Sequence, residues 1–240
     1  MARDKRTKLA DSDDELGNFI DFKPREFKFS EKQEIVLKTL LDKDTKIVFL
    51  SGFAGTAKTF LSMYAAAHLL NGGKCNQIIY IRSLVESSSR SMGYLPGLAS
   101  EKFQPYMLPL LEKGEEIIQD KCLQKLIDGH RIVAMPINFL RGASWKDKVV
   151  VMDEVQNTTG CELLTCLSRI GENTRIFVCG DQRQSDINGK SGFNDFIRIF
   201  STEDCKERGI FHFDFGKEDI FRSEILRFIM EKIELLDDKK

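Results

Sequence analysis

Short continuous apolar runs recur along the chain and alternate with stretches in which the apolar residues have helical spacing. The longer runs cover residues 46–50, 77–82, 131–135, 148–153 and 174–181, and a shorter one covers 210–213. Runs of this kind predict strands buried on both faces of a parallel sheet. The stretches between them predict helices over residues 30–41, 58–70, 115–127, 161–170, 191–200 and 219–236. This alternation predicts an α/β fold, a mostly parallel sheet with helices on both faces.

Two regions depart from the alternation. Residues 1–29 mix opposite charges with little apolar periodicity and predict a poorly ordered or loosely packed N-terminal arm, so residues 30–240 would form a single domain. Ser30, at the boundary, is expected to cap the first helix. Residues 83–114 include a serine-rich part and three prolines, two of them in the apolar stretch 102–110, and they predict an irregular segment with a functional or partner-binding role.

A glycine-rich turn joins the first predicted strand to a helix. Backbone N–H groups in such a turn converge on phosphate oxygens, and the positive end of the helix dipole attracts the same anion. Lys58 is expected to reach the terminal phosphates of a nucleotide, and the Thr59 hydroxyl is expected to bind Mg²⁺. The predicted nucleotide-binding loop consists of Gly52, Phe53, Ala54, Gly55, Thr56, Ala57, Lys58 and Thr59. The alternative interpretation is an ordinary glycine-containing turn between a strand and a helix.

Ala57 stands where the strict pattern of this loop has glycine. A methyl group fits there only if the residue has an ordinary negative φ and the phosphate leaves room for it. The departure leaves open whether nucleotide affinity or turnover is reduced.

Polar residues follow two later strands directly. Asp153 and Glu154 come after the fourth apolar run, and residues 180–184 (GDQRQ) come at the end of the fifth. Ligands of open α/β sheets bind at the carboxyl ends of strands, which makes these positions candidates for chemistry. Asp153 is predicted to hold Mg²⁺ and Glu154 to act as the base that orients or deprotonates water. A solvated strand end is the simpler alternative.

Composition limits the classes of partner. Lys and Arg number 36 against 37 Asp and Glu, so the net charge of −1 favours nucleic-acid binding only through a local patch. The six cysteines include no CxxC pair and the three histidines are far apart, which indicates reduced thiols and no metal site built from Cys and His. No apolar run is long enough to span a membrane and no signal peptide is evident, so we expect a cytoplasmic protein.

The motifs together resemble the nucleotide motifs of superfamily 1 helicases and, more closely, the PhoH-like ATPase family. Besides GFAGTAKT, DEVQN (153–157) and GDQRQ, the resemblance rests on YLPG (94–97), FLRG (139–142), SRIG (168–171) and DIFR (219–222), in family order over about residues 30–230. It implies a RecA-like P-loop NTPase fold and a helicase-related ATPase that uses ATP and Mg²⁺ on single-stranded RNA or DNA. The compact length is similar to a stand-alone, phage-type member, which would act in the host cytoplasm if phage-encoded.

The resemblance also implies roles for single residues. Gln33 corresponds to the glutamine that recognises adenine, although a solvated helix residue is the simpler interpretation. Gln184 corresponds to the sensor of the γ-phosphate. Arg222, or else Arg141 or Arg169, corresponds to the arginine that stabilises transition-state charge, although Arg222 could equally pair with a nearby acid. Ser83 follows Arg82 where the family commonly has proline.

Assembly is a further expectation. Superfamily 1 helicases close the nucleotide site with a second RecA-like domain, and only one is expected here. An arginine from a neighbouring subunit would then be needed, which favours a homo-oligomeric ring, and the resemblance suggests a hexamer. Two rival functions are a nucleotide-gated interaction module with little turnover and, more weakly, a small-molecule kinase.

Overall fold

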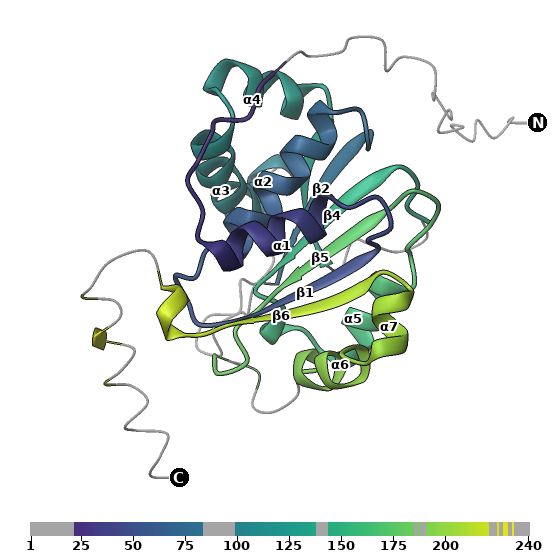
Figure 1. The fold of residues 1–240 in the computed structure, drawn as a ribbon. Helices are drawn as coiled ribbons and strands as arrows, with labels where there is room; N and C mark the ends of the chain where they lie inside the picture. Colours follow the sequence, from purple (N-terminus) through teal and green to yellow (C-terminus); the bar gives the residue numbers. More distant parts are fainter. Residues whose placement is uncertain are drawn as a thin grey trace, which may run out of the picture.

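The computed structural model describes residues 22–83, 99–137, 144–184, 187, 191–220, 225, 228–229 and 232. A six-stranded sheet forms its centre, with all neighbouring strands parallel (Figure 1). The order across the sheet is β3-β2-β4-β5-β1-β6. The strands are β1 (Ile47–Gly52), β2 (Gln77–Arg82), β3 (Ile132–Pro136), β4 (Lys148–Asp153), β5 (Arg175–Cys179) and β6 (Ile210–Phe215). The parallel sheet expected from the apolar runs is therefore confirmed.

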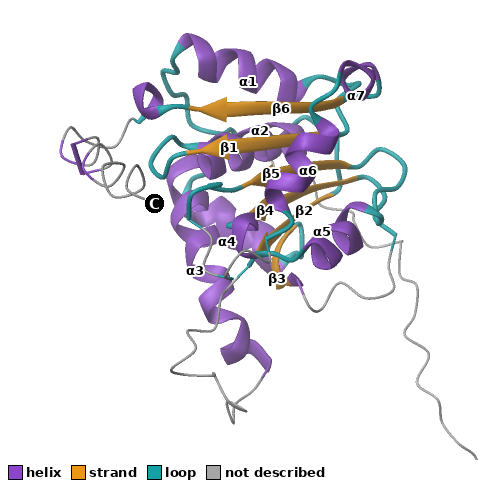
Figure 2. Cartoon of the chain, turned by 90° about the horizontal axis from the view of Figure 1, so that it is seen from below, coloured by secondary structure: helices purple, strands orange, loops and turns teal. Residues whose placement is uncertain are grey.

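Helices cover both faces of the sheet (Figure 2). On one face lie α1 (Glu31–Leu41), α2 (Lys58–Asn71), α3 (Ala99–Ile117) and α4 (Asp120–Asp128). On the other lie α5 (Gly160–Leu167), α6 (Phe193–Phe200) and α7 (Glu203–Glu207). Two short 3₁₀ helices, η2 (Val155–Asn157) and η3 (Lys217–Asp219), follow β4 and β6. With a nucleotide-type loop after β1, this is the RecA-like P-loop arrangement.

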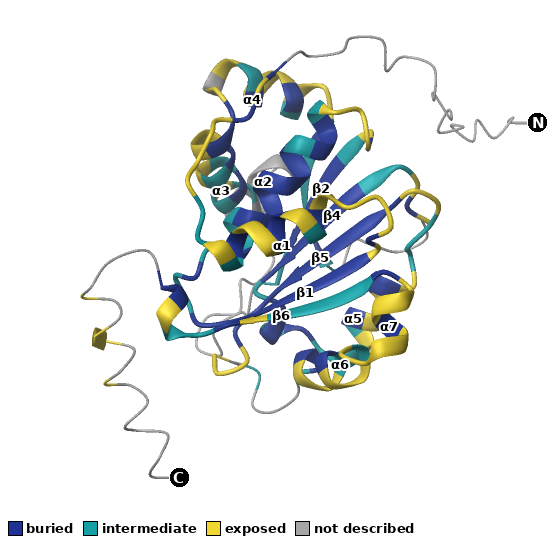
Figure 3. Ribbon diagram, viewed as in Figure 1, coloured by how far each residue is buried: buried dark blue, intermediate teal, exposed yellow. Residues whose placement is uncertain are grey.

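The core has two layers because successive strand residues point to opposite faces. Along β1, Val48 and Leu50 pack toward α1–α4, whereas Ile47 and Phe49 pack toward α5–α7. The central strands are buried on both faces (Figure 3). Burial of this extent holds the strand ends, and any side chains on them, in fixed positions.

The expectation that residues 83–114 are irregular is wrong for the second half of this range. Helix α3 begins at Ala99 and continues through both Pro105 and Pro109 to Ile117. Leu110 and Ile117 are fully buried in the same apolar layer as Leu123 of α4, so burial outweighs the local cost of proline in a helix. The helix expected over 115–127 is accordingly divided between α3 and α4. Residues 84–98 lie outside the described residues.

Part of the expected N-terminal arm is described and packs on the domain. Phe22 is buried, the Arg25 N–H donates to the Ile117 carbonyl at 2.8 Å, and the Phe27 ring meets Phe60 edge-on at 5.0 Å between centroids. Ser30 caps α1 as expected, through a reciprocal pair of hydrogen bonds with Gln33. Residues 1–21 lie outside the described residues, as does most of the final helix expected over 219–236.

Gly192 provides a test of the packing between α5 and α6. A Cβ at this position would lie 2.4 Å from the Gly160 Cα, whereas a Cβ at Gly160 would lie 3.9 Å from its nearest neighbours. We expect Gly192→Ala to lower the free energy of unfolding by about 1–3 kcal/mol, because backbone must move to admit the methyl group.

Thermal unfolding measures this effect, at roughly 2–4 °C of melting temperature per kcal/mol for a chain of this size. Gly160→Ala is the matched control and should change the melting temperature little. Equal effects of the two substitutions would contradict the close approach of the two backbones.

Candidate functional site

A cavity of about 490 Å³ lies at the carboxyl edge of the sheet. It is bordered by the turn after β1, by the ends of β2, β4 and β5, and by one side of α3. The predicted site residues that line it are Ala54, Gly55, Ala57, Lys58, Thr59, Asp153, Glu154 and Gln184. Residues far apart in the sequence therefore meet at one cavity, because parallel strands present their carboxyl ends at the same edge.

Glycine is required at the start of the loop. Gly52 has a φ of +127°, and a Cβ there would lie 2.1 Å from the Phe215 carbonyl oxygen of β6. Gly55 also has a positive φ, of +83°. The Thr56 hydroxyl donates to the Phe53 carbonyl at 2.7 Å and closes the turn. The loop is thus shaped by contacts with β6 and within itself.

Ala57 does not meet the condition of a negative φ. Ala57 has φ 64° and ψ 20°, in the left-handed region, at the position that precedes α2. An L-residue other than glycine is strained there by roughly 1–2 kcal/mol. No side chain caps α2 at this residue.

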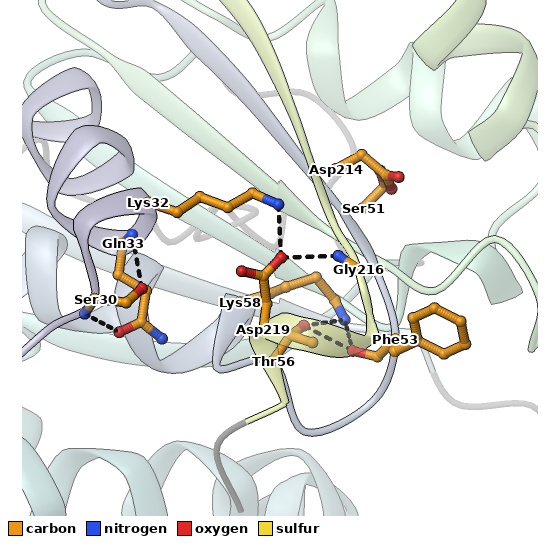
Figure 4. A network of polar contacts seen from close by, with 10 residues as sticks. All are labelled: Ser30, Lys32, Gln33, Ser51, Phe53, Thr56, Lys58, Asp214, Gly216 and Asp219. Carbon is orange, nitrogen blue, oxygen red and sulfur yellow. Dashed lines mark hydrogen bonds and ion pairs between the residues drawn. The ribbon is translucent and has the colours of Figure 1, made fainter. Parts of the chain in front are cut away.

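Lys58 is buried and bound by its own loop (Figure 4). Its Nζ donates to the carbonyl oxygens of Gly52 and Phe53, both at 2.7 Å, and to the Thr56 hydroxyl at 3.3 Å. Burial lowers the pKa of Lys58, and the nearby carboxylates, first among them Asp181, act in the opposite direction. A phosphate would offer this ammonium group negatively charged oxygen atoms in place of neutral carbonyl oxygens.

Asp153 accepts hydrogen bonds from two hydroxyl groups. The Thr59 hydroxyl donates to its Oδ1 at 2.6 Å, and the Tyr80 hydroxyl of β2 donates to its Oδ2 at 2.5 Å. Burial, and then the charge of Asp153, raise the pKa of Tyr80. A carboxylate and a hydroxyl in contact are oxygen ligands of the type that Mg²⁺ takes, so Thr59 and Asp153 fit the metal expected from the sequence. No group of three or more His, Cys, Asp or Glu in the described ranges is placed to hold a metal.

Sequence reasoning missed Tyr80, which it treated as one apolar residue of the second strand. The available signal was a hydroxyl group close to the end of a strand that leads to the same edge as Asp153. Only the neighbouring position of β2 and β4 shows that the two side chains meet.

A chain of contacts connects Glu154 to the predicted nucleotide-binding loop. Its Oε2 accepts from the Gln156 amide at 2.6 Å, and the Gln156 oxygen accepts from the Asp181 N–H at 3.0 Å. The Asp181 carboxylate in turn accepts from the Ala54 N–H at 3.1 Å. Glu154 itself has a positive φ of 55°, a conformation that the surrounding contacts must hold. Gln156 was not among the predicted site residues, and it joins the two acidic strand ends.

The other predicted residues are placed as follows. Gln184 lines the cavity, and its N–H donates to the Asp181 carbonyl at 3.2 Å. Gln33 does not line the cavity, and only 3% of its surface is exposed, so the solvated alternative is wrong. Arg169 does not line the cavity. Its backbone carbonyl accepts a hydrogen bond from the N–H of Trp145, a residue that precedes β4 in the sequence. Arg141 and Arg222 lie outside the described residues.

Asp219, the first residue of the DIFR motif, joins α1 to the segment after β6 (Figure 4). Its Oδ2 accepts from Lys32 Nζ at 2.6 Å and from the Gly216 N–H at 2.8 Å. Lys32 precedes Gln33 in α1, so the helix that bears the predicted adenine-recognition residue is fixed to the segment that leads toward Arg222.

The parallel sheet, the predicted nucleotide-binding loop and the Asp153–Glu154 strand end define the fold class of the RecA-like P-loop proteins. Comparison with protein families identifies the lineage more closely. The family model described as "PhoH-like protein" matches residues 27–234, and the chain belongs to this family.

Several curated relatives resemble the chain over most of its length. It is 36% identical to a PhoH-like protein of Mycobacterium bovis over 68% of this chain and 47% of the relative. It is 31% identical to a PhoH-like protein of Bacillus subtilis, over 79% and 58% of the two chains. It is 32% identical to Protein PhoH of Escherichia coli, over 82% and 54%. The chain thus spans about half the length of these relatives.

Solved structures show more distant likenesses. The Pif1 helicase from Candida albicans is 18% identical, with a TM-score of 0.40, over 80% of this chain and 40% of that one. The Sulfolobus solfataricus SWI2/SNF2 ATPase core in complex with dsDNA is 14% identical, with a TM-score of 0.45, over 83% and 46%. In the described part of the chain, no helix combines the length and the apolar character needed to cross a membrane.

The left-handed conformation of Ala57 generates a prediction about stability. Ala57→Gly should raise the free energy of unfolding by up to about 1 kcal/mol, because relief of strain exceeds the added entropy of the unfolded chain. Ala57→Val should lower it, since a β-branched residue tolerates a positive φ least. Chemical denaturation of the three proteins measures the order.

Ala66→Gly is the matched control, because Ala66 lies inside the same helix, α2. There glycine should cost about 1 kcal/mol. If Ala57→Gly destabilised the protein as Ala66→Gly does, the left-handed conformation would be refuted.

The contact between Tyr80 and Asp153 predicts an effect on metal binding. Tyr80→Phe keeps the buried ring but removes the hydroxyl that orients the carboxylate. We expect the Mg²⁺ concentration needed for half-maximal binding of a Mg-nucleotide to rise about 10–100-fold, as for other groups that orient metal ligands.

A magnesium titration of nucleotide binding followed by calorimetry provides the measurement. Tyr64→Phe, in α2 and packed against Phe29, is the control and should leave the titration unchanged. An unaltered magnesium requirement in Tyr80→Phe would show that Thr59 alone suffices to orient Asp153.

Proposed function

We propose that the protein binds ATP with Mg²⁺, hydrolyses it, and uses the reaction to move or remodel single-stranded RNA or DNA. The observation that carries the proposal is the meeting of Lys58, Thr59, Asp153, Glu154 and Gln184 at one cavity on the carboxyl edge of the sheet. This combination suits phosphoryl transfer to water, which depends on positioning and on neutralising charge.

Each residue of the cavity has a proposed task. Lys58 and the loop amides bind the terminal phosphates, and Thr59 with Asp153 holds Mg²⁺, which neutralises phosphate charge when bound. Glu154 orients and deprotonates the attacking water, a role that the Gln156 amide supports by holding its carboxylate. Gln184 senses the γ-phosphate. Gln33, which lies in α1 outside the lining of the cavity, recognises the adenine base.

Assembly into a homo-oligomeric ring, a hexamer, is part of the proposal. The described residues form one RecA-like domain, and its cavity lies at the carboxyl edge of the sheet. An arginine supplied by a neighbour, with Arg222 as the candidate, would raise the rate by several orders of magnitude. The isolated monomer should then be a poor ATPase.

A second candidate function is a nucleotide-gated interaction module with little turnover. It is favoured by the contacts of Lys58 with its own loop, which must be exchanged before the ammonium group binds phosphate, and by Ala57 in place of the usual glycine. In this case nucleotide would bind and alter the surface of the protein without being hydrolysed.

Two substitutions separate these functions. Lys58→Ala should abolish hydrolysis and weaken nucleotide binding without unfolding the domain, because the residue stabilises phosphate charge. Glu154→Gln should keep ATP binding but lower kcat by roughly 100–10,000-fold, the usual contribution of a general base. Phosphate release, and ATP binding by calorimetry, are measured for each oligomeric state of the protein, with and without single-stranded RNA and DNA.

Glu203→Gln is the control, since Glu203 is an exposed acid of α7 paired with Lys206. Wild-type turnover in Glu154→Gln would remove Glu154 from the proposed role. ATP binding without hydrolysis in every oligomer and with every nucleic acid would favour the interaction module. A phosphorylated small molecule in place of free phosphate would indicate a kinase.

A further inference from the structure

Arg82 ends β2 inside the candidate site. Its Cα is opposite that of Asp153 in the register of β2 and β4, and among the described residues that line the cavity it is the one arginine. None of the roles proposed above uses it. A guanidinium group in this position therefore needs an explanation.

The guanidinium has few partners for a group so enclosed. Its Nη2 lies 3.7 Å from Glu154 Oε1, beyond hydrogen-bond distance, and its Nε is buried with no hydrogen-bond partner in the described part of the chain. About a quarter of the side chain (26%) is exposed. A guanidinium offers five N–H donors, and burying them without acceptors is costly. This suggests that a ligand supplies the missing acceptors.

The other cations of the cavity already have partners. Lys58 is held by the carbonyl oxygens of its loop, and Lys113 of α3 pairs with Glu116 at 3.1 Å. The remaining charged groups that line the cavity are carboxylates. Arg82 is thus the cation whose donors are least committed, and its planar fork matches the oxygen atoms of a phosphate group.

The backbone around Arg82 is fixed against the segment that bears Glu154. The Ser83 N–H donates to the Asp153 carbonyl at 3.2 Å, and the Ser83 hydroxyl donates to the Asn157 carbonyl at 2.8 Å. The proline expected here from the family pattern would lack the N–H for the first of these bonds. The backbone segments that bear Arg82 and Glu154 are therefore held side by side at the edge of the sheet.

We propose that Arg82 binds the terminal phosphate of a nucleoside triphosphate within the chain's own site. It exchanges its long contact with Glu154 for phosphate oxygens, so that the site distinguishes a triphosphate from a diphosphate. The inference rests on the proposed nucleotide function and adds a specificity-determining residue to it. An arginine from a neighbouring subunit would act in addition to Arg82.

The test compares binding of ADP and of a slowly hydrolysed ATP analogue, each with Mg²⁺, by calorimetry on the full chain. Arg82→Ala should raise Kd for the triphosphate about tenfold or more, in line with the loss of charged hydrogen bonds, and leave Kd for ADP within about twofold. Arg82→Lys keeps the charge but not the planar fork, so its Kd for the triphosphate should lie between those of the wild type and Arg82→Ala. Arg198→Ala, an exposed arginine of α6 paired with Asp195, is the matched control.

Other outcomes would overturn the inference. Equal losses for ADP and the triphosphate would indicate general damage to the pocket, and unchanged binding of both would exclude a phosphate contact. If Glu154→Ala removed the effect of Arg82→Ala on triphosphate binding, Arg82 would act through Glu154 and not on phosphate. A wild-type protein that binds neither nucleotide would refute the proposed function itself, which distinguishes that failure from failure of this inference.

Discussion

The candidate site depends on one carboxylate held by two hydroxyl groups. Asp153 at the end of β4 accepts from Thr59 at the start of α2 and from Tyr80 within β2, so three segments distant in sequence are fixed to one another. Charge-assisted hydrogen bonds of this kind are stronger than neutral ones, and burial protects them from water. The carboxylate is therefore already oriented at the position where the proposed metal site would use it as a ligand.

A second set of contacts extends this arrangement across the sheet. Gln156 bonds both the Glu154 carboxylate and the Asp181 N–H, and Asp181 reaches the Ala54 N–H of the loop. A change in any of these segments would alter the others, because a buried amide that loses one hydrogen-bond partner lowers the stability of the protein. Such a chain provides a physical route by which a phosphate in the loop would affect the ends of β4 and β5.

The loop itself is strained and self-bound. Ala57 has a left-handed conformation, and Lys58 donates to the carbonyl oxygens of the residues before it. The Lys58 contacts must be exchanged when the loop admits an anion, and the binding of phosphate oxygens must offset that cost. The strain at Ala57 is already present in the loop and lowers the stability of the fold. Alanine in place of the usual glycine therefore changes the free energy of the loop as well as the sequence pattern.

The sequence by itself determined the parallel sheet, the capped first helix, the loop and the acidic strand ends, because apolar periodicity, capping residues and glycine spacing are local signals. It did not predict α3, whose prolines oppose a helix that burial of Leu110 and Ile117 stabilises. It also missed the positive φ of Ala57 and the contacts of Tyr80 and Arg82 at the cavity. Those features arise from strand order, which decides what lies beside what, and only the tertiary structure fixes it.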